Sequence, residues 1–286
     1  MQKYLKPIIA LFTFYAFNWV VALLSQLALV FHNPQFITAI LTGEYTDEHY
    51  SIMRSPEVIG SSRIVAAIII LIFLSRTNII NPKLYVRTKN IRWSYTIFGL
   101  VGFNLLFYAF EHILSLMPMF HEELEENGGA TTYTYGIMLS IYLAIFSPIV
   151  EECIFRAGIL GNLMKEGMSQ WKAIIISAII FGACHYSIER AIPTAVFAII
   201  TGWLYVKTRS LAPSTILHII NNCTSLLLYH LSANGTYDKV TSELGTTNLW
   251  IANIIIGIIA ITGVTIYVRM TRNDKQSKTV SPTIEK

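Results

Sequence analysis

The chain has 286 residues, of which 53% are hydrophobic and only 13% carry a charge, with a net charge of +4. Soluble domains carry about 25% charged residues, so this composition excludes a water-exposed globule. The 9 prolines, 16 glycines and 3 cysteines also exclude a collagen-like or disordered chain and a disulfide-rich scaffold. The composition therefore indicates a protein that crosses a membrane several times.

Eight apolar stretches are candidates for membrane-spanning helices, since about 20 apolar residues cross the hydrocarbon core of a bilayer. In chain order they are residues 7–31, 57–75, 93–115, 132–164, 172–188, 191–206, 210–232 and 249–268. The first is too long for the core of a signal peptide, and no Ala-x-Ala cleavage site follows it. The sequence thus predicts an all-α fold, a polytopic transmembrane helical bundle of about eight spans that forms one domain over residues 1–272. We expect the polar segment 273–286 to be a disordered cytoplasmic tail.

The distribution of basic residues predicts the orientation of the bundle. With the N-terminus inside, the inner segments hold 17 of the 21 Lys and Arg residues but only 5 of the 17 acidic residues. The other basic residues are Arg54, Arg190 and Lys239 in outer segments and Arg63 near the outer end of the predicted span 57–75. Because cytoplasmic loops are enriched in Lys and Arg, both termini are expected to be cytoplasmic. The positive net charge follows from basic loops that face anionic lipid headgroups, and it requires no nucleic-acid partner.

Three charged residues interrupt the apolar stretch between residues 127 and 165, namely Glu151, Glu152 and Arg156. Ionisable residues within membrane spans are costly and indicate function. Glu152 and Arg156 are four residues apart, so they can pair on one helix face, whereas Glu151 points about 100° away. The alternative is a span that ends at Val150, with all three charges solvated on the cytoplasmic side.

Depth within the membrane favours the buried interpretation. Glu151, His185 and Asn222 each lie 13 or 14 residues from the basic residue at the inner end of their own span, and His218 lies nine residues from it. At 1.5 Å per residue, the first three are about 20 Å from the inner boundary and His218 is about one turn closer to it. Polar side chains from three spans can therefore meet at nearly one depth.

Such a set of side chains can hydrolyse a peptide bond without a serine or cysteine nucleophile. A carboxylate and a histidine can take a proton from water, while a second histidine and an asparagine stabilise the resulting oxyanion. The same groups could instead bind a divalent metal such as zinc. No His-Glu-x-x-His or Gly-x-Ser-x-Gly motif occurs in the sequence, and no aspartate lies in a predicted span. We expect the three cysteines beside these motifs to be packing residues, because neighbours on a helix point about 100° apart.

Three short motifs carry these polar residues. They read Glu-Glu-x-x-x-Arg at 151–156, Phe-x-x-x-His at 181–185 and His-x-x-x-Asn at 218–222. In this order they resemble the signature motifs of the CPBP family, which contains type II CAAX prenyl proteases and the bacteriocin-processing and self-immunity proteins also called the Abi family. The resemblance covers about residues 130–230, and the rest of the chain matches only as hydrophobic helices.

The resemblance implies a role for each motif residue. Glu151 and His185 would activate water, and His218 and Asn222 would stabilise the oxyanion. Glu152 and Arg156 would be supporting residues that hold the helix and touch substrate. Phe181 would pack the pocket.

The function implied is that of an intramembrane endopeptidase, of the glutamate type or a metalloprotease. No organic cofactor is expected, and a divalent metal (zinc) is compatible with these residues but not required by them. The expected partners are the lipid bilayer and a peptide substrate, either prenylated or a leader or bacteriocin peptide. The small size, short loops and lack of added domains favour a bacterial plasma membrane. The alternatives are a non-proteolytic self-immunity or regulatory protein that binds a partner peptide or helix and, third, a transporter.

Overall fold

The computed structural model describes residues 4–32, 36–86, 91, 93–115, 117, 136–185, 187–233 and 236–279. Every regular element in these residues is a helix, which confirms the predicted all-α fold. Within the described residues, six helices are long and apolar enough to cross a membrane: Leu5–Ala28, Pro56–Arg76, Thr96–Leu114, Ile137–Lys165, Ile188–Thr208 and Thr246–Ile266. The chain is therefore a helical, multi-pass membrane protein.

The other two predicted spans are also helices, but they are less suited to crossing a membrane. Helix α11 (Gln170–Ala183) has 14 residues, fewer than a full span needs. Helix α13 (Ala212–Ala233) has 22 residues but carries two histidines and two asparagines. The count of eight spans and the cytoplasmic position of the termini stay predictions.

Contacts within the chain divide it into two compact units, which are described one at a time. The first unit contains residues 1–88 and 119–227, and the second contains residues 89–118 and 228–286. The predicted single bundle over residues 1–272 stays a prediction.

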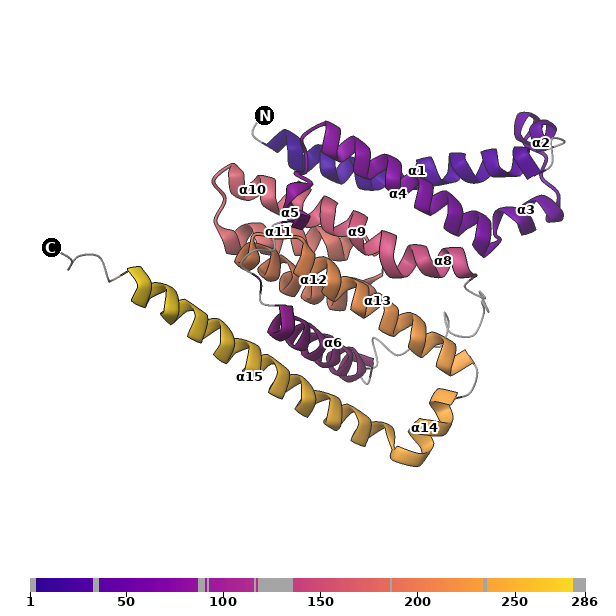
Figure 1. Cartoon of the computed structure of the whole chain (residues 1–286). Coiled ribbons are helices and arrows are strands. Elements are labelled where there is room, and N and C mark those ends of the chain that lie inside the picture. The colour runs from indigo at the N-terminus through magenta and orange to yellow at the C-terminus, as the bar shows by residue number, and fades with distance from the viewer. Residues whose placement is uncertain are drawn as a thin grey trace. The chain divides into compact units, whose positions relative to one another are not determined.

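In the first unit, α1 (Leu5–His32) packs against α4 (Pro56–Arg76), with α2 (Phe36–Thr42) and α3 (Asp47–Met53) between them in the chain (Figure 1). Small side chains permit this approach, since Ala10, Ala66 and Ala67 are completely buried. Gly60 of α4 lies against the backbone of the next long helix, where an added Cβ would overlap the backbone of Leu139. Only glycine fits such a contact.

The long helix over residues 137–165 carries the first motif and contains two π-helical segments. Its successive segments are α8 (Ile137–Ile141), the π-helical η2 (Tyr142–Phe146), α9 (Ser147–Glu152), the π-helical η3 (Cys153–Leu160) and α10 (Gly161–Lys165). Sequence analysis predicts one continuous helix over 132–164; its first four residues lie outside the described part of the chain. π-Helical turns are rare and occur frequently at functional sites.

Proline explains the first π-helical segment. The N–H of Ser147 donates to the carbonyl of Tyr142, five residues earlier, as in a π-helix. The carbonyl of Leu143 would then need the N–H of residue 148, but this residue is Pro148 and has none. One backbone acceptor is therefore left without its helical partner in the turn before Glu151.

Helices α11 and α12 (Ile188–Thr208) form a hairpin, since α11 ends at Ala183 and α12 begins five residues later. They approach closely because Gly182 faces the carbonyl oxygen of Ala191, 2.6 Å from where a Cβ would be. The predicted span 172–188 is too long at its C-terminal end. Ser187 accepts a hydrogen bond from the N–H of Arg190 and so caps α12, which therefore begins at Ile188, while α11 ends at Ala183.

The second unit contains α6 (Trp93–Ser115), α14 (Thr236–Leu244) and α15 (Thr246–Thr279), with α6 packed along α15. Glycines permit this contact, as in other membrane helix pairs. Gly102 faces Ala260, and Gly257 faces Leu106. Helix α15 extends to Thr279, whereas the sequence predicts a disordered tail from residue 273. No glycine or proline interrupts residues 264–279, so no residue of this segment is a strong helix breaker.

Candidate active site

His218 of α13 contacts both glutamates of the first motif. Its Nδ1 atom lies 3.1 Å from Oε1 of Glu152, and its Nε2 atom lies 3.6 Å from Oε2 of Glu151. The structure thus brings together the first and third motifs, which are 66 residues apart. A neutral imidazole carries one N–H, so donation to both carboxylates requires the protonated ring.

Glu152 and Arg156 form the ion pair that their spacing predicts. Oε2 of Glu152 lies 3.2 Å from Nε of Arg156, and the two side chains are 0% and 1% exposed. Arg156 also donates to the hydroxyl of Thr201 on α12, and its guanidinium lies 4.7 Å from the ring centre of Phe181. The alternative of a solvated cytoplasmic cap is therefore wrong for this pair.

Phe181 of α11 forms an aromatic wall between the two motif histidines. Its ring centre lies 5.1 Å from that of His185 and 6.0 Å from that of His218, both at steep angles. Phe155 also belongs to this aromatic cluster, since its ring centre lies 4.7 Å from that of Phe181. These contacts match the packing role that the family resemblance implies for Phe181.

His185 lies in the turn after α11, rather than inside a helix as predicted. Its Nδ1 atom lies 2.9 Å from the carbonyl oxygen of Phe181. Since a carbonyl oxygen only accepts, Nδ1 is the protonated nitrogen, and in the neutral ring Nε2 is then an acceptor. Among the described residues, no hydrogen bond or ion pair joins His185 to Glu151. The second motif therefore contributes a base whose free nitrogen contacts neither glutamate directly.

Asn222 lies one turn after His218 and bonds to the long helix. Its Nδ2 atom donates to the carbonyl of Leu143 at 2.8 Å. This carbonyl is the one that loses its helical donor at Pro148. The Asn222 amide carries a second N–H, which this bond leaves available.

Two further residues of the site come from outside the motifs. Ser147 donates its hydroxyl proton to Oε1 of Glu151 at 2.5 Å, from one turn earlier on the same helix. The four-residue spacing of these two residues is a signal that the sequence carries, although sequence analysis did not use it. Thr201, the partner of Arg156, lies 45 residues away in the chain and has no such signal.

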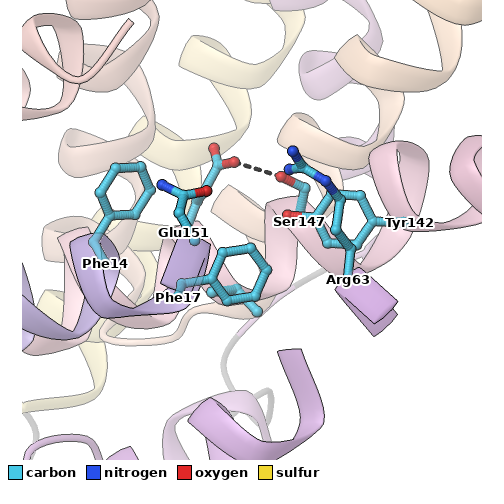
Figure 2. Close-up of a pocket in the computed structure, with 8 residues that line it drawn as sticks. Phe14, Phe17, Arg63, Tyr142, Ser147 and Glu151 are labelled. Carbon is cyan, nitrogen blue, oxygen red and sulfur yellow. Dashed lines mark hydrogen bonds between the residues drawn. The ribbon is translucent and has the colours of Figure 1, made fainter. Parts of the chain in front are cut away.

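A pocket of about 100 Å³ opens beside Glu151, with space for several water molecules. Its lining comes from α1, from α4 and from the segment 142–151: Phe14, Phe17, Asn18, Arg63, Tyr142, Ser147, Val150 and Glu151. Figure 2 shows the Glu151 carboxylate and the Ser147 hydroxyl bonded to each other at this pocket. Of the residues predicted for the site, Glu151 is the one that lines the pocket.

The donor groups of the site are not arranged as the ligands of a metal ion. No three His, Cys, Asp or Glu side chains in the described part of the chain are arranged to bind a metal ion. Both nitrogens of His218 face carboxylates, and Glu152 is paired with Arg156 as well. This arrangement does not fit the three or four ligands of a zinc site. Free cysteines also fail to provide a ligand cluster: Cys153 and Cys184 are buried, and Cys223 is exposed.

The apolar helices and the buried charged residues between them define a multi-pass membrane protein with a polar intramembrane site. The family model described as "Type II CAAX prenyl endopeptidase Rce1-like" matches residues 133–224. This segment holds all three motifs, so the match supports the resemblance of the chain to the CPBP family of CAAX-type membrane proteases. Comparison with curated proteins and with solved structures found no further match.

Proposed function

We propose that the protein is an intramembrane endopeptidase in which Glu151 and His185 activate a water molecule for attack on a peptide bond. The observation that carries this proposal is the meeting of two glutamates and His218 in a buried, largely apolar setting. A purely structural ion pair needs only Glu152 and Arg156. It leaves the second glutamate, the histidine beside it and the adjoining pocket without a role.

Glu151 is suited to act as the general base. Its Oε1 atom accepts the hydrogen bond from Ser147, which fixes the carboxylate, and the pocket beside it holds water-sized space. His185 offers Nε2 as a second acceptor. A water bound by both would lose a proton to this pair as its oxygen attacks the substrate carbonyl, and the leaving amine would later take that proton.

His218 and Asn222 are suited to stabilise the oxyanion that this attack creates. Glu152 holds Nδ1 of His218, so the opposite nitrogen is directed to the side of the ring on which Glu151 lies. A protonated His218 can donate from this nitrogen, and Asn222 can donate its second amide N–H. One such donor typically contributes a factor of about 10²–10³ to kcat.

The remaining motif residues hold this arrangement in place. The buried Glu152–Arg156 pair orients His218 through the second oxygen of Glu152, and Phe181 packs beside both histidines. These residues need no organic cofactor, and zinc is not required for the chemistry described.

The proposed substrate is a peptide or protein with a cleavage site within or near the bilayer, such as a prenylated C-terminus, a leader peptide or a bacteriocin. We further propose eight spans, cytoplasmic termini and a bacterial plasma membrane as the location. The positive-inside distribution of Lys and Arg, 17 against 4, supports this topology.

The proposal is tested by comparing Glu151→Gln and His185→Ala with the unmodified protein in cells and after purification. Each change should reduce cleavage about 100-fold or more, because water activation needs both acceptors. Peptides extracted from the cells, compared by mass spectrometry, should then lose the same products in both variants. Exposed residues of the same types provide matched controls, Glu44→Gln and His230→Ala, and these should keep full activity.

Two results would contradict the proposal. Activity like that of the unmodified protein in either active-site variant would rule out this mechanism. Identical peptides in cells with the unmodified protein and with Glu151→Gln, although both proteins insert and purify, would favour the non-proteolytic immunity or regulatory protein.

A further inference from the structure

Arg63 is a basic residue within a membrane-spanning helix that no motif includes. It lies seven residues after Pro56, the first residue of α4, or about 10 Å along the helix axis. A charged residue within a span is costly and indicates function unless a partner neutralises it.

The described part of the chain offers Arg63 no acidic partner. No described carboxylate lies within ion-pair distance of its guanidinium, and its buried Nε atom has no hydrogen-bond acceptor there. Its central carbon instead lies 5.4 Å from the ring centre of Tyr142, a cation–π distance. Tyr142 thus holds the guanidinium in place, while the Nε–H donor of Arg63 stays without an acceptor in the described part of the chain.

Arg63 lines the same small pocket as Glu151. The two side chains come from different helices, α4 and α9, and Figure 2 shows both turned toward this space. Phe14 and Phe17 provide an apolar wall, which lowers the polarity beside the charged groups and so strengthens electrostatic interactions within the pocket. A cation whose Nε–H donor has no acceptor among the described residues therefore lines the same pocket as the proposed general base.

We propose that Arg63 binds a carboxylate of the substrate peptide and so selects peptides that carry one close to the cleaved bond. This inference rests on the proposed function, because it takes the pocket at Glu151 as the place where substrate binds. The planar guanidinium matches a carboxylate with two parallel hydrogen bonds. In a peptide, such a group is either the free C-terminus or an Asp or Glu side chain.

A second role for Arg63 makes a different prediction. If Arg63 only balanced the charge of Glu151, its removal would affect all substrates equally. Glu151 already has a hydroxyl donor in Ser147 and a neighbouring imidazole in His218, so its carboxylate does not depend on Arg63 alone. Substrate preference therefore separates the two roles.

The test uses binding as well as cleavage. Three fluorescent mixtures of short randomised peptides without Asp or Glu are prepared: one with a free C-terminal acid, one with a C-terminal amide, and one amidated with a single internal Glu. Their affinity for the full-length Glu151→Gln protein in detergent is measured by fluorescence anisotropy, with and without Arg63→Gln. Cleavage of the same mixtures by protein with an intact Glu151 is followed by mass spectrometry.

A carboxylate-containing mixture should bind about 10- to 100-fold more tightly than the amide mixture, since hydrogen bonds to charged groups are of this strength. The acid and internal-Glu mixtures reveal which carboxylate is recognised. Arg63→Gln should bring the ratio of the two affinities, carboxylate-containing over amide mixture, close to one. Arg63→Lys keeps the charge but not the planar guanidinium, and it should retain part of this ratio. Arg76→Gln removes an exposed basic residue from the same helix and should leave the ratio unchanged.

Equal affinity for all three mixtures, or a ratio that survives Arg63→Gln, would overturn this inference. So would an equal loss of cleavage for acid and amide mixtures in Arg63→Gln, which is the result expected if Arg63 only serves Glu151. The proposed function fails separately, if cleavage of the mixtures does not depend on Glu151. Carboxylate-dependent binding would then still be measured in the Glu151→Gln protein.

Discussion

Removing either member of the buried Glu152–Arg156 pair should destabilise the protein strongly. The two side chains are 0% and 1% exposed and 3.2 Å apart, so each substitution leaves the other charge in a medium that hydrates it poorly. Breaking such a pair costs about 3–5 kcal/mol. We expect Glu152→Gln and Arg156→Met each to lower the melting temperature, and the double substitution to recover part of the loss because it leaves no unpaired charge in this pair.

The structure predicts that the two single substitutions differ. Glu152 has two charged or chargeable partners, since its second oxygen lies 3.1 Å from His218. Arg156→Met therefore leaves Glu152 with one partner, and its cost should lie near 3 kcal/mol. Glu152→Gln leaves both Arg156 and His218 without a carboxylate at these positions, and its cost should lie near 5 kcal/mol.

The assay is a double-mutant cycle by thermal shift in detergent. The double variant should be more stable than the sum of the single losses predicts, by about 0.5–3 kcal/mol, which is the range for residues in direct contact. The control is a second double-mutant cycle with Glu48→Gln and Arg76→Met. These two exposed residues lie on different helices, so the effects of their substitutions should add. Strictly additive losses for Glu152 and Arg156 would refute the pairing on which the mechanism of His218 depends.

Two other predictions concern the general base and the topology. Ser147→Ala should lower kcat about tenfold with little change in melting temperature, because one hydrogen bond to a charged group is lost. The control Ser242→Ala, which changes an exposed serine, should have no effect. An unchanged kcat in Ser147→Ala would mean that Ser147 does not hold the Glu151 carboxylate. The topology is tested with single cysteines introduced at Glu123 and at Lys275, in a chain whose exposed Cys223 is replaced. The two cysteines should react with a membrane-impermeant reagent from opposite sides of the membrane. Labelling of both from the same side would contradict the predicted orientation.

The part of the site that the sequence predicts is the part that depends on helical spacing and depth. The four-residue interval predicts the Glu152–Arg156 pair, and counting residues from the inner boundary predicts that His218 approaches the glutamates. Both follow from helix geometry alone, because a span fixes direction and rise. Contacts of this kind are found in the structure for the first and third motifs.

The rest of the site depends on how helices pack against one another, which spacing does not encode. Nothing in the sequence around Thr201 of α12 indicates its contact with Arg156. Phe14 and Arg63 line the pocket only because α1 and α4 pack beside the first motif. The end of α11 was predicted too late for a local reason. The cap of α12 at Ser187 takes the preceding residues out of the helix, and an apolar count cannot detect this.

The π-helical turn before Glu151 connects local sequence to the geometry of the site. Pro148 removes one N–H, which leaves the carbonyl of Leu143 without a donor from its own helix. An unsatisfied carbonyl inside a membrane protein is costly, and Asn222 supplies the missing donor from α13. The same bond fixes the axial position of α13 along the helix over residues 137–165. His218 lies one turn from Asn222 and is thereby placed beside Glu151 and Glu152. The asparagine of the third motif therefore has a reason to be present before any oxyanion forms: it satisfies the acceptor that the proline leaves open, and it aligns the histidine with the carboxylates.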